Sequence, residues 1–398
     1  MKGKKLALCY VSFLFIIACF ALLVLFAASP EPKDSAQFLL SLASGLAAII
    51  LFGVMSAMDP QPEEENEKTR LARLGIRYAL FALLASLTQL TLPSLVQGFA
   101  PDLYTMLGAD NVQFLTIILS VDVFGFGALF LSTKSIEKTA IEKKSMGFGK
   151  LLLFFLMTIG LAGVGAIVGY VVNNLVTAPG SAGGGSALNN LMMNSGMGMR
   201  VLTVGILAPI FEELVFRKLL VDRLVKYGEF VAIATSGICF GLFHGNFSQS
   251  FFTAMVGCLW AFVYVRTGNI LNTILLHMAV NLTTSIITIS LATKMAAYDL
   301  TEMTDTSQIY ALMETNPEAV TAVGMFGLWL IFLCLLALIG LIIFIVFFAQ
   351  KKFRLKRLEN EPTKLKTLGF MFGNTYTWLF YLICIGLFAI VYLPGWLK

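Results

Sequence analysis

Long runs of apolar residues alternate with short polar segments along almost the whole chain. A helix needs about 20 residues to cross the roughly 30 Å hydrocarbon layer of a membrane, so the pattern predicts membrane-spanning helices. The strands of a membrane barrel would alternate apolar and polar residues, whereas residues 328–348 are apolar throughout. We therefore expect an all-α fold, a polytopic transmembrane helix bundle. About eleven spans are predicted, near 6–28, 36–58, 75–97, 112–132, 150–172, 200–220, 229–246, 248–266, 270–296, 321–349 and 373–396.

Composition and charge agree with this class. Charged residues make up 13% of the chain, about half of the ~25% typical of soluble domains. Lysine and arginine in short loops mark the cytoplasmic side of a membrane protein. Basic clusters near 2–5, 68–77, 134–150, 218–226 and 351–366 all fall on the side of the N-terminus when the predicted spans are counted. The N-terminus is thus predicted to be cytoplasmic. The net charge of +5 is explained by these loops and gives no reason to expect nucleic-acid binding.

Four regions are predicted. Residues 1–172 form an N-terminal bundle of about five spans, and 173–199 form an external linker rich in Gly, Ser and Met. Residues 200–296 hold every feature that suggests chemistry. Residues 297–398 contain an external acidic loop and two C-terminal spans.

The candidate chemistry lies in three apolar runs. The chain has two histidines, His244 and His277, and each lies inside such a run, while a third run carries the adjacent pair Glu212 and Glu213. Ionisable side chains are costly in hydrocarbon, so they usually face the protein interior and mark function. Two imidazoles and two carboxylates are sufficient for acid–base hydrolysis.

Helical spacing relates these residues to others. Glu213 and Arg217 are four residues apart and can pair on one face of a helix, while Glu212 points about 100° away. The spacing also stacks Phe240 beside His244 and directs His277 and Asn281 into the same space. Pro209 removes a backbone hydrogen bond just before the glutamates and can kink or open their helix.

These residues resemble a family of intramembrane proteases, the CAAX prenyl endopeptidases and bacteriocin-processing or abortive-infection proteins (CPBP). The family pattern is EExxxR, then FxxxH, then HxxxN. Here Glu212-Glu213 with Arg217, Phe240 with His244, and His277 with Asn281 follow in that order, about 30 residues apart. The match covers 200–296, so substrate choice cannot be carried over to this chain.

The resemblance implies a role for each residue, and the chemistry permits the same roles. Glu212 is the expected general base for water, and His244 holds or co-activates that water. His277 and Asn281 donate to the oxyanion. Glu213, Arg217 and Phe240 support these groups. Zinc held by Glu212, His244 and His277 is the alternative, although the compact HExxH signature is absent. We expect no obligatory metal.

Two observations complicate this interpretation. Counting residues from the loops places His277, Glu212 and His244 at different depths, which a tilt, the Pro209 kink or a half-span at 229–246 would reconcile. Asp122 is an isolated acid inside the span 112–132. It is expected to pair with another helix, although a proton or ion path would also use such a residue.

The leading hypothesis is an endopeptidase in a bacterial-type plasma membrane, acting on a membrane-associated protein or peptide. A proton- or ion-coupled transporter is the first alternative, because midplane acids are also transporter features. However, no paired inverted halves are visible in the sequence. A catalytically silent immunity or peptide-binding protein is the second alternative. The sequence does not indicate the oligomeric state.

Overall fold

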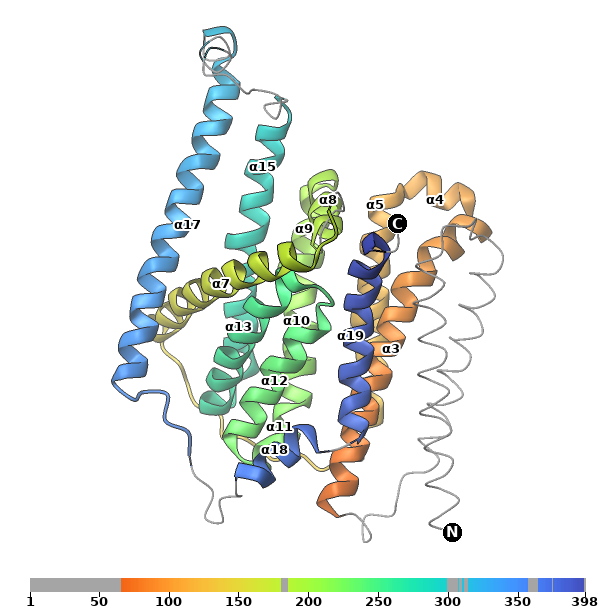
Figure 1. Cartoon of the computed structure of the whole chain (residues 1–398), viewed down its shortest axis with the longest axis vertical. Helices are drawn as coiled ribbons and strands as arrows, with labels where there is room; N and C mark the ends of the chain where they lie inside the picture. Colours follow the sequence, from red (N-terminus) through yellow and green to blue (C-terminus); the bar gives the residue numbers. More distant parts are fainter. Residues whose placement is uncertain are drawn as a thin grey trace.

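The computed structural model describes residues 66–179, 185–298, 307, 310, 314–356, 364–373 and 375–396. Every element in these ranges is a helix, so the all-α prediction is confirmed for them (Figure 1). The first two predicted spans, 6–28 and 36–58, lie outside the described residues.

Most elements follow one another directly, but residues 134–147 between α6 and α7 form an irregular segment. They are α3 (Glu67–Phe99), α4 (Pro101–Leu107), α5 (Ala109–Ile117), η2 (Ile118–Gly125), α6 (Phe126–Thr133), α7 (Phe148–Val176), α8 (Ser186–Asn194), α9 (Met197–Arg200), η3 (Val201–Leu207), α10 (Ala208–Glu213), η4 (Leu214–Leu219), α11 (Val221–Leu224), η5 (Val225–Tyr227), α12 (Glu229–Phe243), α13 (Phe247–Thr267), α14 (Ile270–Asn281), η6 (Leu282–Ile287), α15 (Thr288–Ala296), α17 (Pro317–Ala349), α18 (Lys364–Phe372) and α19 (Thr375–Trp396). The segments η2, η3, η4 and η6 are π-helical and η5 is a 3₁₀ turn.

Among the described residues, six helices are long and apolar enough to cross a membrane, and a bent pair would make a seventh. The six are Glu67–Phe99, Ala109–Thr133, Phe148–Val176, Phe247–Thr267, Ile270–Ala296 and Pro317–Ala349, and the bent pair is Lys366–Phe372 with Thr377–Leu393. The predicted count of eleven spans is therefore not confirmed.

Two of the predicted spans account for part of the difference. The run 200–220 is helical but carries both glutamates of the pair and three basic residues, which makes it too polar to count as a simple span. The run 229–246 corresponds to α12, which has 15 residues. At 1.5 Å per residue it is about 22 Å long, shorter than a hydrocarbon layer of roughly 30 Å.

Helix α7 lies across the upright helices rather than alongside them (Figure 1). Its glycines permit the close crossings. A methyl group on Gly160 would meet the backbone of Leu341 in α17 at 2.3 Å, and one on Gly165 would meet Phe252 in α13 at 2.4 Å. Small residues allow helices to approach closely where no hydrophobic effect drives them together. Gly160 and Gly165 thus fix α7 against both α17 and α13.

Helices α12 and α13 form a tight hairpin. Gly237 and Gly241 of α12 face the backbone of α13, where an added methyl group would come within 2.8 Å of backbone oxygens. Gly245 has φ +65 in the turn, a conformation that glycine adopts without strain. The Asn246 side chain then caps α13 by accepting from the Gln249 amide at 3.0 Å. This turn places His244 at the end of α12.

The last helix, α19, packs along α3, the first described helix (Figure 1). The rings of Tyr78 and Phe380 meet edge to face at 6.2 Å. Tyr78 also donates a hydrogen bond to the Val215 carbonyl in η4 at 2.7 Å. Helices from outside 200–296 therefore support the helical run that carries the two glutamates.

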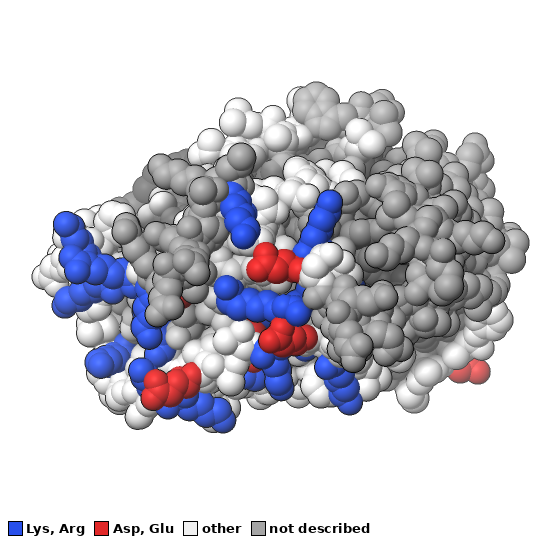
Figure 2. Space-filling model, turned by 90° about the horizontal axis from the view of Figure 1, so that it is seen from below, with Lys and Arg blue, Asp and Glu red and all other residues white. Residues whose placement is uncertain are grey.

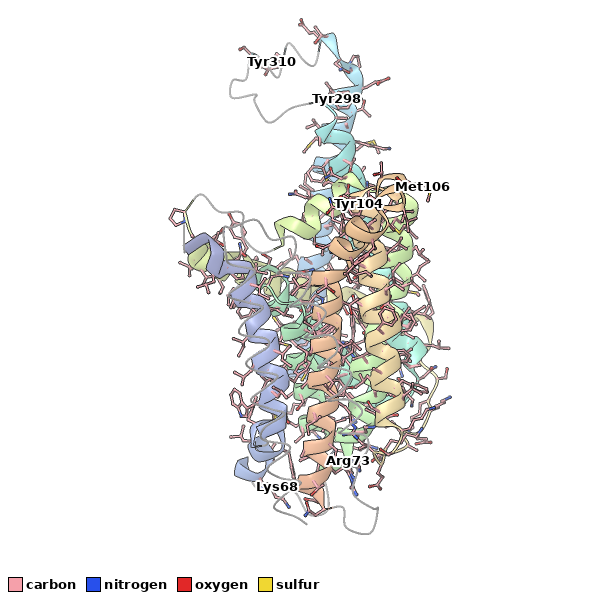
Figure 3. All side chains as sticks on the ribbon, turned by 90° about the vertical axis from the view of Figure 1, so that its right-hand side faces the viewer. Lys68, Arg73, Tyr104, Met106, Tyr298 and Tyr310 are labelled. Carbon is pink, nitrogen blue, oxygen red and sulfur yellow. The ribbon has the colours of Figure 1, made fainter. Side chains whose placement is uncertain are left out.

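One end of the molecule is basic. Figure 2 shows lysine and arginine side chains gathered on the lower face of the view in Figure 1. In Figure 3, Lys68 and Arg73 lie at this end, and Tyr104, Met106 and Tyr298 lie at the other. Ion pairs join segments far apart in sequence here: Glu137 pairs with Arg70 at 2.8 Å and with Lys226 at 2.9 Å. We predict that this basic end is the cytoplasmic one.

Candidate active site

One helical run from α9 to η4 carries Glu212 and Glu213, and it is π-helical on both sides of them. A π turn contains more residues than an α turn, so it changes the direction of the side chains that follow, and such turns are frequent at functional sites. Pro209 lies in the first turn of α10, directly after the π-helical η3. The helix is therefore irregular just before the carboxylates.

The pair of Glu213 and Arg217 is fully buried. Arg217 Nε lies 3.2 Å from Glu213 Oε2, and both side chains are 0% exposed. The guanidinium carbon lies 4.5 Å from the centre of the Phe240 ring and 5.5 Å from that of Trp260. The flat faces of a guanidinium stack favourably on aromatic rings. The ion pair that the spacing predicts is present, and two aromatic rings cover it.

His277 lies between the two glutamates. Its Nδ1 is 3.1 Å from Glu213 Oε1 and its Nε2 is 3.6 Å from Glu212 Oε2. The ring of Trp260 packs 4.4 Å from the imidazole, and the Trp260 indole N–H is held by the Thr158 hydroxyl at 3.1 Å. Trp260 was not predicted from the sequence, because one tryptophan in an apolar helix resembles ordinary packing.

The two glutamates differ in access. The Glu212 side chain is 17% exposed, whereas that of Glu213 is 0% exposed. Only Glu212 can meet water or a substrate without a rearrangement of the core. Glu213 is already occupied by Arg217 and His277.

His244 is half-buried at the end of α12. Its Nδ1 lies 2.8 Å from the Phe240 carbonyl oxygen. A carbonyl oxygen only accepts, so Nδ1 carries the proton in the neutral ring and Nε2 is the nitrogen that can accept a hydrogen bond. Nε2 of His244 is therefore the atom that can hold a water molecule.

Phe240 is the residue at which the three sequence motifs meet. Its ring centre lies 4.9 Å from that of His244 and 5.9 Å from that of His277, and Arg217 stacks on it. The histidines and the buried ion pair thus surround one aromatic ring. The difference in depth that residue counting predicts is removed by the short α12 and the π turns around α10.

Asn281 contacts a different part of the same run. Its side-chain amide donates to the Val204 carbonyl in η3 at 2.9 Å. One amide N–H is used in this bond, and the other remains for a second acceptor. His277 and Asn281 both face the run that carries the glutamates, as their spacing predicts.

A third carboxylate lies nearby. Asp122 is 5% exposed and belongs to η2, which packs against α10. The ring of Phe126, the first residue of α6, meets that of Phe211 in α10 at 5.2 Å. Asp122 and Glu212 are close enough for their negative charges to repel each other. Within the described ranges no hydrogen bond or ion pair joins Asp122 to another residue, so the partner that we expected on another helix is not found there. The sequence predicts a buried acid at position 122, but it does not predict that this acid lies near Glu212.

The positions of the side chains decide whether Glu212, His244 and His277 could hold zinc. The described residues contain no group of three or more His, Cys, Asp or Glu side chains placed to hold a metal ion. Each histidine bonds through Nδ1, His277 to Glu213 and His244 to a carbonyl, so Nε2 is the nitrogen that would face a metal, and the positions of the side chains decide the question. The set Glu212, His244 and His277 does not fit a zinc site in this arrangement, and we derive no step through a metal.

Comparison with known proteins agrees with the motif pattern. Residues 195–283 match the family model described as "Type II CAAX prenyl endopeptidase Rce1-like", which includes all seven motif residues. The chain is 31% identical over 84 residues to the Bacillus subtilis (strain 168) protein named "Putative membrane peptidase YdiL". This match covers 21% of the chain and 34% of that protein, so it spans about a third of the relative's length. No solved structure matches the chain. The predicted resemblance is confirmed.

Proposed function

We propose that this integral membrane protein, whose residues 195–283 form a type II CAAX prenyl endopeptidase Rce1-like domain, is an intramembrane endopeptidase. Its substrate would be a protein or peptide associated with the bilayer. The observation that carries the proposal is the position of His277 between Glu213, whose side chain is fully buried, and Glu212, whose side chain is partly exposed. The name of the Bacillus subtilis relative, a membrane peptidase, points the same way.

In the proposed reaction Glu212 is the general base. It takes a proton from the attacking water and later returns it to the leaving amine. His244 holds the same water through Nε2, because its Nδ1 is occupied by the Phe240 carbonyl. The water is thereby oriented towards the scissile carbonyl carbon.

His277 and Asn281 are proposed to stabilise the oxyanion. Because His277 uses its Nδ1 proton for Glu213, it donates from Nε2 only when both ring nitrogens are protonated. Two carboxylates lie beside the ring to balance that positive charge. Asn281 donates the N–H that is not used by Val204. Glu213 and Arg217 fix the orientation of the imidazole.

The cellular setting is also a proposal. The relative belongs to a bacterium, so we expect the chain in a bacterial-type plasma membrane. A catalytic group buried among membrane helices requires its peptide to enter from the bilayer or its surface.

The test works without an identified substrate. Purified wild-type chain and the variant Glu212→Gln are each incubated with a detergent-solubilised bacterial membrane fraction in half-enriched H₂¹⁸O, and new protein N-termini are labelled. The wild type should generate N-termini that are absent with the variant, and about half of the molecules with each new C-terminal carboxylate should carry one ¹⁸O atom. Indistinguishable sets of N-termini from the two proteins would rule out this function.

A further inference from the structure

A cavity of about 650 Å³ opens on the basic end of the molecule, away from the glutamates and histidines. It lies between α3, the segment after α6 and the helices η4 and α11. Five basic and two acidic side chains line it. Figure 2 shows this face, with its lysines and arginines interspersed with a few acidic groups. The volume is within the range of small-molecule sites.

Both acidic groups are already paired. Glu137 contacts Arg70 and Lys226, and these two cations hold the pKa of the Glu137 carboxyl below its usual value. Asp222 contacts Lys218 at 2.8 Å and accepts the Tyr264 hydroxyl at 2.7 Å. The negative charges therefore neutralise Arg70 and Lys218 but not the rest of the lining.

Three cations in the lining have no carboxylate partner among the described residues. Lys134 lies over the Phe130 ring at 5.0 Å, and the ammonium of Lys138 is exposed. Arg223 is 5% exposed and bonds only to the carbonyls of Leu219 and Thr133, while its Nε has no acceptor. Arg223 lines the cavity, so its positive charge adds to the attraction of an anion there.

The cavity also has an apolar border. Phe130, which lines it, is 44% exposed on α6, and the next residue, Leu131, is 61% exposed. α6 ends a helix that is long and apolar enough to cross the membrane, so we infer that these exposed apolar side chains contact lipid. A ligand with an anionic head and acyl chains matches this combination of a cationic cavity and an adjoining lipid-facing surface. A free phosphate would use only the cavity.

We propose that this cavity binds the phosphate group of an anionic membrane phospholipid, with Lys134, Lys138 and Arg223 around the phosphate and the acyl chains along Phe130 and Leu131. Basic pockets between membrane helices are known to take anionic head groups, and each lysine near such a surface contributes about 1 kcal/mol. The proposal does not depend on the proteolytic function.

The test measures binding of dioctanoyl phosphatidylglycerol to the purified full chain in detergent, by native mass spectrometry and by the rise in unfolding temperature with lipid concentration. The double variant Lys134→Gln/Lys138→Gln should bind this lipid about 30-fold more weakly. The matched control, Lys143→Gln/Lys150→Gln, removes the same charge from exposed positions outside the cavity and should bind within about twofold of wild type.

Three outcomes would overturn the proposal. Equal weakening in both double variants would mean a general attraction to the basic face. Equally tight binding of dioctanoyl phosphatidylcholine would mean that no net anionic charge is recognised. Inorganic phosphate that displaces the lipid at equal concentration would identify a soluble anion, rather than a lipid, as the ligand. A wild type that binds phosphatidylglycerol selectively, with loss only in the cavity variant, supports the proposal.

Discussion

The Nδ1 nitrogen of His277 donates to the carboxylate of Glu213 across 3.1 Å. This bond joins α14 to α10, 64 residues apart in sequence. A carboxylate that is also paired with Arg217 can only accept, so the bond fixes both the orientation of the imidazole and the position of its first proton. Nε2 of His277 then faces Glu212. The arrangement separates a glutamate that holds the ring from one that is free to react.

Glu212→Gln should abolish peptide hydrolysis, a loss of about 10²–10⁴-fold or more, with an unchanged unfolding temperature in detergent. Glutamine keeps the size of the side chain but cannot take a proton from water. The exposed Glu318 provides a control, since Glu318→Gln should retain full activity. Turnover near the wild-type rate in purified Glu212→Gln would remove Glu212 as the general base.

Glu213→Gln and Arg217→Gln should each destabilise the protein by about 3–5 kcal/mol, because each leaves a buried charge without its partner. The double variant Glu213→Gln/Arg217→Gln should lose less than the sum of the two, and thermal unfolding in detergent measures all three. Activity should fall in both single variants, since the His277 ring is no longer held. A double-mutant cycle with no coupling energy would contradict this role of the pair.

The parts of the site that a single helix determines could be predicted from the sequence. Glu213 with Arg217 and Phe240 with His244 are each four residues apart, and both contacts are present because helical periodicity fixes them. The all-helical fold follows equally from the length of the apolar runs.

The contacts between helices could not be predicted in this way. Helical spacing places Glu212 about 100° away from Glu213 but does not show that it faces His277, a contact that depends on how α14 packs against α10, which lies between two π-helical segments. Asp122 was visible as a buried acid, but its position near Glu212 depends on the packing of η2 against α10. The predicted span count is not confirmed within the described residues, where the helices that carry the site are shorter or more polar than simple spans.

Asn281→Ala should lower kcat by about 10²–10³-fold with little change in KM, as expected for a lost oxyanion donor. The variant also loses the bond to the Val204 carbonyl, so its unfolding temperature should fall slightly. Steady-state kinetics and thermal unfolding are measured on the same preparation. If a larger unfolded fraction fully explained the loss of activity, Asn281 would have only a structural role, the anchoring of η3.

Removal of metal ions should leave most of the activity. This follows from the poor fit of Glu212, His244 and His277 to a zinc site among the described residues. Protein treated with a chelator and checked by elemental analysis is compared with untreated protein. Stoichiometric zinc that is lost in His277→Ala, together with activity that returns to stripped wild type only on zinc addition, would contradict this prediction.

Asp122→Asn should make the protein more stable and less active. The carboxylate is buried without a partner among the described residues, and burying a charge without a partner costs more than burying a neutral group of similar size, so its replacement by a neutral amide should raise the unfolding temperature. The same change removes a negative charge close to Glu212. Neighbouring residues of this kind couple by about 0.5–3 kcal/mol, which corresponds to a loss in kcat of roughly tenfold.

Asp102→Asn, at an exposed position on α4, is the control and should change neither the unfolding temperature nor kcat. A lower unfolding temperature in Asp122→Asn would mean that Asp122 is paired within the whole chain, and unchanged kcat would separate it from the chemistry of Glu212.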